Sequence, residues 1–216
     1  MNKRARSLTA KLEKRQKILA AAKELFFSKG YHGTRIEMIA KKAGISTGTF
    51  YLYYRNKTEI FKALQDEGID ILMNMVQQVV AWPNLGSLEK LEQIVHTYLR
   101  FHDEYRKYFD ILAILSASPE ELKESSSEIS KVIDRKTFQF LKMVESVFVD
   151  GMEKGDIVTV DSWKATNVFW GIMDGMILLE ERRNIENTIR ISLKELIEQA
   201  LQIAFYGIST RSKTGR

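Results

Sequence analysis

The chain has 216 residues, of which 44% are apolar and 28% are charged, a composition typical of a folded globular protein and not of a disordered one. It contains no cysteine, which excludes disulfide bonds, thiolate metal sites and cysteine nucleophiles. No apolar run approaches the roughly 20 residues of a membrane-spanning helix, and the basic N-terminus lacks the apolar stretch of a signal peptide. We therefore expect a cytoplasmic protein.

Charge is distributed unevenly along the chain. Residues 1–62 contain 15 Lys and Arg against 4 Asp and Glu, a net charge of +11, whereas residues 63–216 contain 18 against 24, a net charge of −6. A basic block joined to a mildly acidic body indicates that the N-terminal part meets a polyanion. A solvated basic surface without a partner is the alternative.

Helix start and stop signals divide the whole chain into segments in which apolar residues recur with helical period. The N-terminal segments cover residues 18–29, 34–43, 46–53 and 57–80, the last ending before Pro83. The later segments cover residues 87–115 with a kink after 102, a start at 118–121, and then 129–152, 161–183 and 187–206. Because the only β-leaning stretch, 157–160, has four residues, we predict an all-α fold of about nine helices.

The segments between Thr34 and Lys57 form a predicted helix-turn-helix, the arrangement that offers its second helix to the DNA major groove. Gly44 permits the left-handed turn between the two helices. Phe50 points back into a small core. Five residues are left facing outward, namely Thr47, Gly48, Thr49, Tyr51 and Tyr53.

The run Thr34-x4-Ile39-Ala40-x2-Ala43-Gly44-Ile45-Ser46-x-Gly48-Thr49-Phe50-Tyr51-x-Tyr53-Tyr54-x-Asn56-Lys57 closely resembles the DNA-binding signature of TetR-family (tetracycline-repressor-like) regulators. The resemblance covers residues 15–60, and beyond them only length and helical pattern agree. It implies a homodimeric all-α repressor with an N-terminal three-helix head, residues 1–58, and a larger helical bundle for ligand binding and dimerisation, residues 59–216. In such proteins a small ligand shifts the spacing of the two DNA-reading heads.

The resemblance also implies which residues meet DNA. Phosphate contacts fall to residues at the start of the second helix and after the third, whereas the third helix faces bases and adjacent backbone. The candidate DNA-binding residues are Thr34, Arg35, Ser46, Thr47, Gly48, Thr49, Tyr51, Tyr53 and Lys57. The arm before residue 18 carries seven Lys and Arg against one Glu; a flexible arm of this kind can neutralise phosphates or enter a minor groove, and a solvated tail is the alternative.

Two features of the C-terminal segments predict a dimer interface. Gly171 and Gly175 lie four residues apart within a helix, where each costs about 1 kcal/mol relative to Ala, a cost that makes sense if another helix approaches closely on that face. The last helix has a broad apolar stripe that includes Leu193, Leu196, Ile197, Ala200 and Leu201. Two such helices from each subunit would form an intermolecular four-helix bundle. The alternative is that both stripes face only the protomer's own core.

Large, adaptable side chains in the middle of the chain are compatible with an apolar ligand cavity between helices, although ordinary core packing gives the same pattern. The candidate ligand-binding residues are Phe101, Tyr105, Tyr108, Phe109, Phe138, Phe169, Trp170 and Met173. Five basic residues could receive an anionic head group at the mouth of this cavity, namely Arg100, Arg106, Lys107, Arg135 and Lys136. The effector would be a small apolar or amphipathic molecule, such as an acyl-CoA or a drug-like compound.

No hydrolase, metalloprotease, phosphate-loop or dinucleotide motif is present. His96 and His102 diverge by about 240° around one helix, so they cannot share a metal. We therefore expect no catalysis, metal, cofactor or membrane partner, and predict a ligand-responsive repressor that binds a palindromic operator as a homodimer. A regulator without an effector is one alternative. Another is a helical small-molecule carrier whose basic head binds phosphate without reading sequence.

Overall fold

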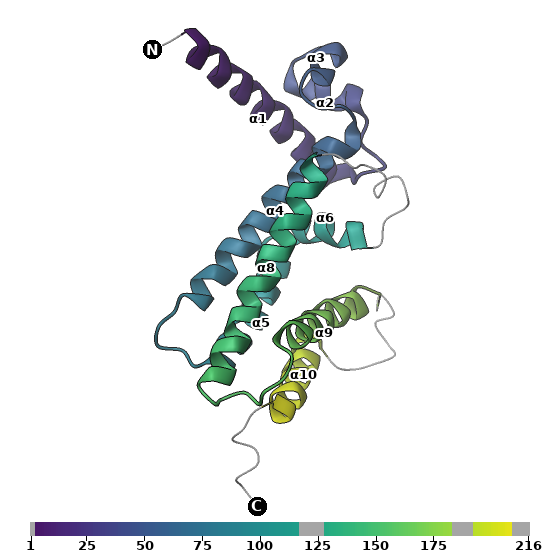
Figure 1. Ribbon diagram of the computed structural model, residues 1–216. Coiled ribbons are helices and arrows are strands. Elements are labelled where there is room, and N and C mark those ends of the chain that lie inside the picture. The colour runs from purple at the N-terminus through teal and green to yellow at the C-terminus, as the bar shows by residue number, and fades with distance from the viewer. Residues whose placement is uncertain (1–2, 117–127, 183–191, 209–216) are drawn as a thin grey trace, which may run out of the picture. The chain divides into compact units, whose positions relative to one another are not determined.

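The computed structural model describes residues 3–116, 128–182 and 192–208, and their regular structure is helical (Figure 1). The N-terminal helices are α1 (Lys3–Lys29), α2 (Ile36–Ala43), α3 (Thr47–Tyr51) and α4 (Lys57–Val80). They are followed by α5 (Ser87–Glu104), α6 (Arg106–Ser116), α8 (Glu128–Glu153), α9 (Ser162–Arg182) and α10 (Leu193–Ile208). The predicted all-α class is confirmed.

Among the boundaries that differ from those predicted are the start of α1 and the end of α3. Helix α1 begins at Lys3 instead of Ile18, because residues 3–17 contain no Pro or Gly and are rich in helix-forming Lys, Arg, Ala and Leu. Helix α3 ends at Tyr51, two residues early. The expected helix starts at 118–121 and 187 lie outside the described residues. Segment 157–160 is a connection in which the Val158 N–H donates to the Ile208 carbonyl at 2.8 Å.

Packing divides the chain into two compact units, one of residues 1–71 and 102–136 and one of residues 72–101 and 137–216. The first unit contains the predicted helix-turn-helix, and the second contains α9 and α10, which pack against each other. This division by packing does not test the predicted boundary at residue 58 between a DNA-binding domain and a domain for ligand binding and dimerisation, which stays a prediction.

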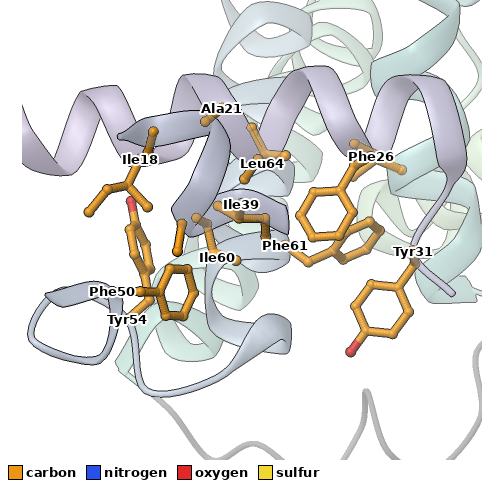
Figure 2. Packing of buried hydrophobic residues seen from close by; sticks show 14 residues of the cluster. Ile18, Ala21, Phe26, Tyr31, Ile39, Phe50, Tyr54, Ile60, Phe61 and Leu64 are labelled. Carbon is orange, nitrogen blue, oxygen red and sulfur yellow. The ribbon is translucent and has the colours of Figure 1, made fainter. Parts of the chain in front are cut away.

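The first unit is built around one buried apolar cluster to which α1, α2, α3 and α4 all contribute (Figure 2). Ile18 and Ile39 are fully buried at its centre. The Phe26 and Phe61 rings meet edge to face with centroids 5.2 Å apart. Removal of the residues of this cluster from water supplies the main force that holds the short helices α2 and α3 on α1 and α4.

The second unit is held by aromatic contacts between its helices. Phe148 of α8 meets Phe169 of α9 edge to face at 5.8 Å between centroids. Ile197 and Leu201 of α10 are buried as well. Within the described parts of the chain, no helix is long and apolar enough to cross a membrane.

Candidate functional site

The connection between α2 and α3 is fixed by backbone geometry. Gly44 adopts a left-handed conformation, with φ of 66° and ψ of 40°, which residues with a Cβ rarely adopt. Its N–H donates to the Lys41 carbonyl at 3.1 Å, and the Ile45 N–H donates to the Ala40 carbonyl at 3.0 Å. These bonds satisfy carbonyls at the end of α2 and set the direction in which the chain enters α3.

Helix α3 is capped at its start by a serine and anchored by a phenylalanine. The Thr49 N–H donates to Ser46 Oγ at 3.1 Å, and the Ser46 and Thr49 hydroxyls share a hydrogen bond of 2.8 Å. Phe50 is fully buried. Ser46 is therefore the N-cap of α3, and the predicted role of Phe50 as a core residue is confirmed.

The face of α3 opposite Phe50 is open to solvent. Gly48 is exposed, Tyr51 is 52% exposed and Leu52 is 75% exposed, whereas Thr47 and Thr49 are half-buried. Leu52 was not among the predicted site residues. Its position two residues after Phe50, roughly 200° around the helix, is the signal that could have identified it.

Two residues that were predicted to contact phosphate, Thr34 and Lys57, form hydrogen bonds within the protein instead. The Thr34 side chain is fully buried, and its hydroxyl donates to the Gly30 carbonyl at 2.8 Å. This hydroxyl is therefore not available to a phosphate, which corrects the sequence-based expectation. Arg35 beside it is exposed.

Lys57, at the start of α4, holds the connection between α1 and α2. Its Nζ donates to the Tyr31 carbonyl at 2.9 Å and to the Thr34 carbonyl at 3.1 Å. The same ammonium lies 4.1 Å from the centroid of the Tyr31 ring, a cation–π contact. Tyr53, the other expected phosphate contact after α3, is half-buried and packs against the apolar cluster of the first unit.

The second unit brings four of the predicted ligand-binding residues onto α5 and α9. Phe101, Phe169 and Met173 are buried. Trp170 lies with its ring 4.7 Å from that of Tyr98 and 4.7 Å from that of Phe140, measured between centroids.

A polar pair lies within these aromatic contacts. The Tyr98 hydroxyl donates to Asp174 Oδ1 at 2.5 Å. Burial raises the pKa of the Asp174 carboxyl, and hydrogen bonds from Tyr98 and Trp170 oppose that rise. Burial also raises the pKa of Tyr98 well above its ordinary value. We use the name α5–α9 cluster for Tyr98, Trp170 and Asp174 together with Phe101, Phe140, Phe169 and Met173.

The other predicted ligand-binding residues lie elsewhere. Tyr105, Tyr108 and Phe109 belong to the first unit, where the Tyr108 ring meets Phe27 edge to face at 5.2 Å. Burial raises the pKa of Tyr108 to about 12. Phe138 is 52% exposed and lies against Trp163 of α9.

Three of the five basic residues expected at a cavity mouth are engaged by acids. Lys136 pairs with Asp66 at 2.5 Å and with Asp70 at 2.7 Å. Arg106 and Lys107 both pair with Asp110. Because acids already neutralise these three side chains, the five basic residues do not form an anion site as a group. The described residues also contain no cluster of His, Cys, Asp or Glu that could hold a metal ion.

Helix α9 has apolar residues on two sides. Phe169, Met173 and Ile177 are buried in the protomer. The other side is exposed and combines apolar residues with both predicted interface glycines, at which an added Cβ would meet open space. This exposed α9 stripe consists of Val168, Gly171, Ile172, Gly175 and Leu179.

The predicted interface residues of α10 need correction. Ile197 and Leu201 are 1% and 8% exposed, so they pack inside the protomer and offer no surface to a second copy. Leu196 and Ala200 are half-buried. The Leu193 side chain lies outside what the structure describes.

Comparison with known proteins shows which family the helix-turn-helix matches. Residues 18–64 match the family model for bacterial regulatory proteins of the tetR family. The fatty acid metabolism regulator protein of Bacillus subtilis strain 168 is 24% identical over 206 residues, which cover 93% of this chain and 98% of the relative.

Solved structures share the fold. The transcriptional regulator FadR from Bacillus subtilis, in complex with stearoyl-CoA, has a TM-score of 0.68 at 24% identity and covers 89% of this chain and 98% of its own. AibR, in complex with isovaleryl coenzyme A and operator DNA, has a TM-score of 0.62 at 19% identity with the same coverage.

The Lys57 contacts predict that this residue contributes to stability. Lys57→Met keeps much of the side-chain volume but leaves the Tyr31 and Thr34 carbonyls without their charged donor. Hydrogen bonds to charged groups contribute about 1.5–3 kcal/mol, so we expect the free energy of unfolding to fall by about 2 kcal/mol. Urea unfolding measures it, with Lys41→Met at an exposed position of α2 as the control. Equal stability of the two variants would contradict a structural role for Lys57.

Proposed function

Because the chain belongs to the TetR family of bacterial transcriptional regulators, we propose that it is a ligand-responsive repressor that binds a palindromic operator as a homodimer. The observation that carries the proposal is the open face of α3. Phe50 anchors the opposite side of this helix in the core, and the turn at Gly44 sets the direction in which the chain enters it. The proposed role is to bind DNA and a ligand without catalysis. Because the operator lies in the cytoplasm, we expect the protein there as well. Residues 1–58 are the proposed DNA-binding domain, and residues 59–216 bind the ligand and form the dimer.

The open face of α3 supports a specific mode of reading DNA. Gly48 carries no side chain, so the duplex can approach the helix backbone closely. Leu52 offers an apolar surface of the kind that packs on a thymine methyl group, and Tyr51 offers a ring and a hydroxyl. Since α3 contains no Arg or Lys, an arginine–guanine pair from this helix is absent, and DNA shape contributes to specificity.

The remaining contacts of the proposed interface are polar. Thr47 and Thr49 are half-buried residues of α3, and Arg35 before α2 and Tyr53 after α3 are the proposed phosphate contacts. The hydroxyl of Thr34 and the ammonium of Lys57 are not part of the proposed interface, because both are bonded within the protein.

The variant Tyr51→Ala tests the interface directly. Loss of one specific contact to DNA costs about 1–3 kcal/mol, so we expect operator affinity to fall about tenfold or more. The operator is obtained by selection from random duplexes, and fluorescence anisotropy measures binding. Trp82→Ala, a truncation of another half-exposed aromatic side chain in the second unit, should bind as the wild type does. If both variants bind equally well, α3 does not read the operator in this way.

The exposed α9 stripe is the proposed dimer surface. A helix that is apolar on two sides is expected to have packing partners on both, and exposed apolar stripes mark protein interfaces. Gly171 and Gly175 allow the α9 helices of two protomers to approach closely. A symmetric pair of such stripes satisfies the two-fold symmetry that a palindromic operator requires.

Ile172→Lys should dissociate the dimer, because it places one charge from each protomer into the same apolar contact. We expect the dimer dissociation constant to rise at least tenfold, as measured by sedimentation velocity over a concentration series. Val149→Lys is the matched control, since Val149 and Ile172 are 38% and 36% exposed. A dimer of unchanged strength in the Ile172 variant would exclude the α9 stripe as its interface.

The α5–α9 cluster is the proposed effector site. It offers large apolar side chains and one polar pair, the combination that ligand sites use for affinity and orientation. The structural relatives bound to stearoyl-CoA and isovaleryl coenzyme A support an acyl-CoA as the effector class. Release of DNA then requires that the acyl-CoA bind more tightly to a conformation that does not fit the operator.

An acyl-CoA should stabilise the protein and weaken operator binding. At 100 times its dissociation constant, a ligand adds about 2.7 kcal/mol to the free energy of unfolding. Emission from Trp170 in a Trp82→Phe, Trp163→Phe variant reports binding within the cluster. Coenzyme A without an acyl chain is the control and should change neither quantity. If chains from isovaleryl to stearoyl leave stability, emission and operator affinity unchanged, the effector belongs to another chemical class.

A further inference from the structure

Helix α1 begins well before the region that matches the family model. It starts at Lys3, whereas the match begins at residue 18. Residues 6–17 are all exposed, and Ile18, which follows them, is buried. Twelve helical residues extend about 18 Å. In Figure 1 this N-terminal half of α1 projects beyond α2 and α3. We call residues 6–17 the basic extension.

Three of the five positive charges of the basic extension share one side of the helix. Lys11, Lys14 and Arg15 precede Ile18 by seven, four and three residues, so all three lie on its face of the helix. Glu13 precedes Ile18 by five residues and lies on the far side. Because Ile18 is buried against α2 and α3, this basic face is turned toward the helix-turn-helix.

Contacts at the base of the basic extension agree with this orientation. The Arg15 guanidinium lies 5.2 Å from the centroid of the Tyr54 ring, which follows α3. The Lys17 Nζ lies 3.9 Å from the position that a Cβ on Gly44 would occupy, at the turn between α2 and α3. The basic face therefore begins beside the proposed DNA-reading helix and continues away from it.

The basic extension carries unbalanced charge. Lys11 and Arg15 are separated by four residues and Lys11 and Lys14 by three, spacings at which like charges destabilise a helix by a few tenths of a kcal/mol per pair. Within the described part of the chain, no ion pair joins Lys11 or Lys14 to an acid. A polyanion placed along this face would relieve the repulsion.

Building on the proposed operator binding, we propose that the basic extension binds the phosphate backbone of duplex DNA that flanks the bases read by α3, and that it does so without reading sequence. Phosphates recognised by Lys and Arg position a protein on DNA and carry no sequence information. Leu8 and Leu12 are also exposed, but two leucines make a much smaller apolar face than a helix that lies on a membrane requires.

The salt dependence of operator binding tests this inference. Each phosphate contact contributes about 0.9 to the slope of log K against log salt. Lys11→Gln with Lys14→Gln removes four positive charges from a homodimer, so the slope should become less steep by up to about 3.6. The control Lys154→Gln with Lys164→Gln removes the same charge from two exposed lysines of the second unit and should leave the slope unchanged. Equal slopes for the wild type and the Lys11/Lys14 variant overturn the inference.

Shortened duplexes locate the contact. Removing flanking base pairs from the selected operator should weaken the wild type and leave the Lys11/Lys14 variant unaffected. An unchanged thermal unfolding midpoint confirms that the variant is folded, since both side chains are exposed. Wild-type protein that selects no duplex refutes the proposed function itself, whereas a specific operator with equal slopes refutes only the role of the basic extension. Binding to phosphatidylserine vesicles that needs Lys11 and Lys14, together with equal slopes on DNA, overturns the inference in favour of a membrane surface.

Discussion

The burial of Phe50 is the interaction on which the proposed DNA-binding surface depends. Helices shorter than about 12 residues are marginal in water, and α3 has five. Its shape is therefore imposed from outside, by Phe50 in the apolar cluster of the first unit and by Ser46 at its start. Gly48 and Tyr51, together with the C-cap residue Leu52, are exposed because Phe50 on the other side of this short helix is packed into the core.

The connection between α1 and α2 shows how a residue of a DNA-binding signature can act within the protein. Backbone carbonyl oxygens carry partial negative charge, so two of them can accept hydrogen bonds from a lysine ammonium in place of phosphate oxygens. Lys57 lies at the start of α4, where its charge opposes the helix dipole. The Tyr31 and Thr34 carbonyls, together with the Tyr31 ring, compensate for this position. The arrangement fixes the entry to α2 and thereby the helix-turn-helix as a whole.

Local signals in the sequence predicted the helix-turn-helix well, because Gly44, Ser46 and Phe50 each have one dominant role that follows from their own chemistry. The basic extension escaped prediction as a helix because residues 3–17 lack apolar periodicity. The ligand-binding and interface residues were harder to predict, since an apolar side chain has the same helical spacing whether it faces a core, a cavity or a second protomer. Ile197 and Ile172 are both apolar residues in helices, yet only the tertiary packing shows that the first is buried and the second exposed.

Helix α9 links the two proposed roles of the second unit. Trp170 and Asp174 contribute to the α5–α9 cluster, and Ile172 and Gly175 lie on its exposed stripe, so residues of the two surfaces alternate along the same turns. A helix with close packing on both sides cannot rotate or shift for one surface without disturbing the other. The half-buried Asp174 carboxyl adds to this constraint, because movement of α9 away from Tyr98 would remove one of its two hydrogen-bond donors. Under the proposed function, an effector that changes the packing around Trp170 therefore changes the energy of the dimer contact, which is the difference in affinity between two states that regulation requires.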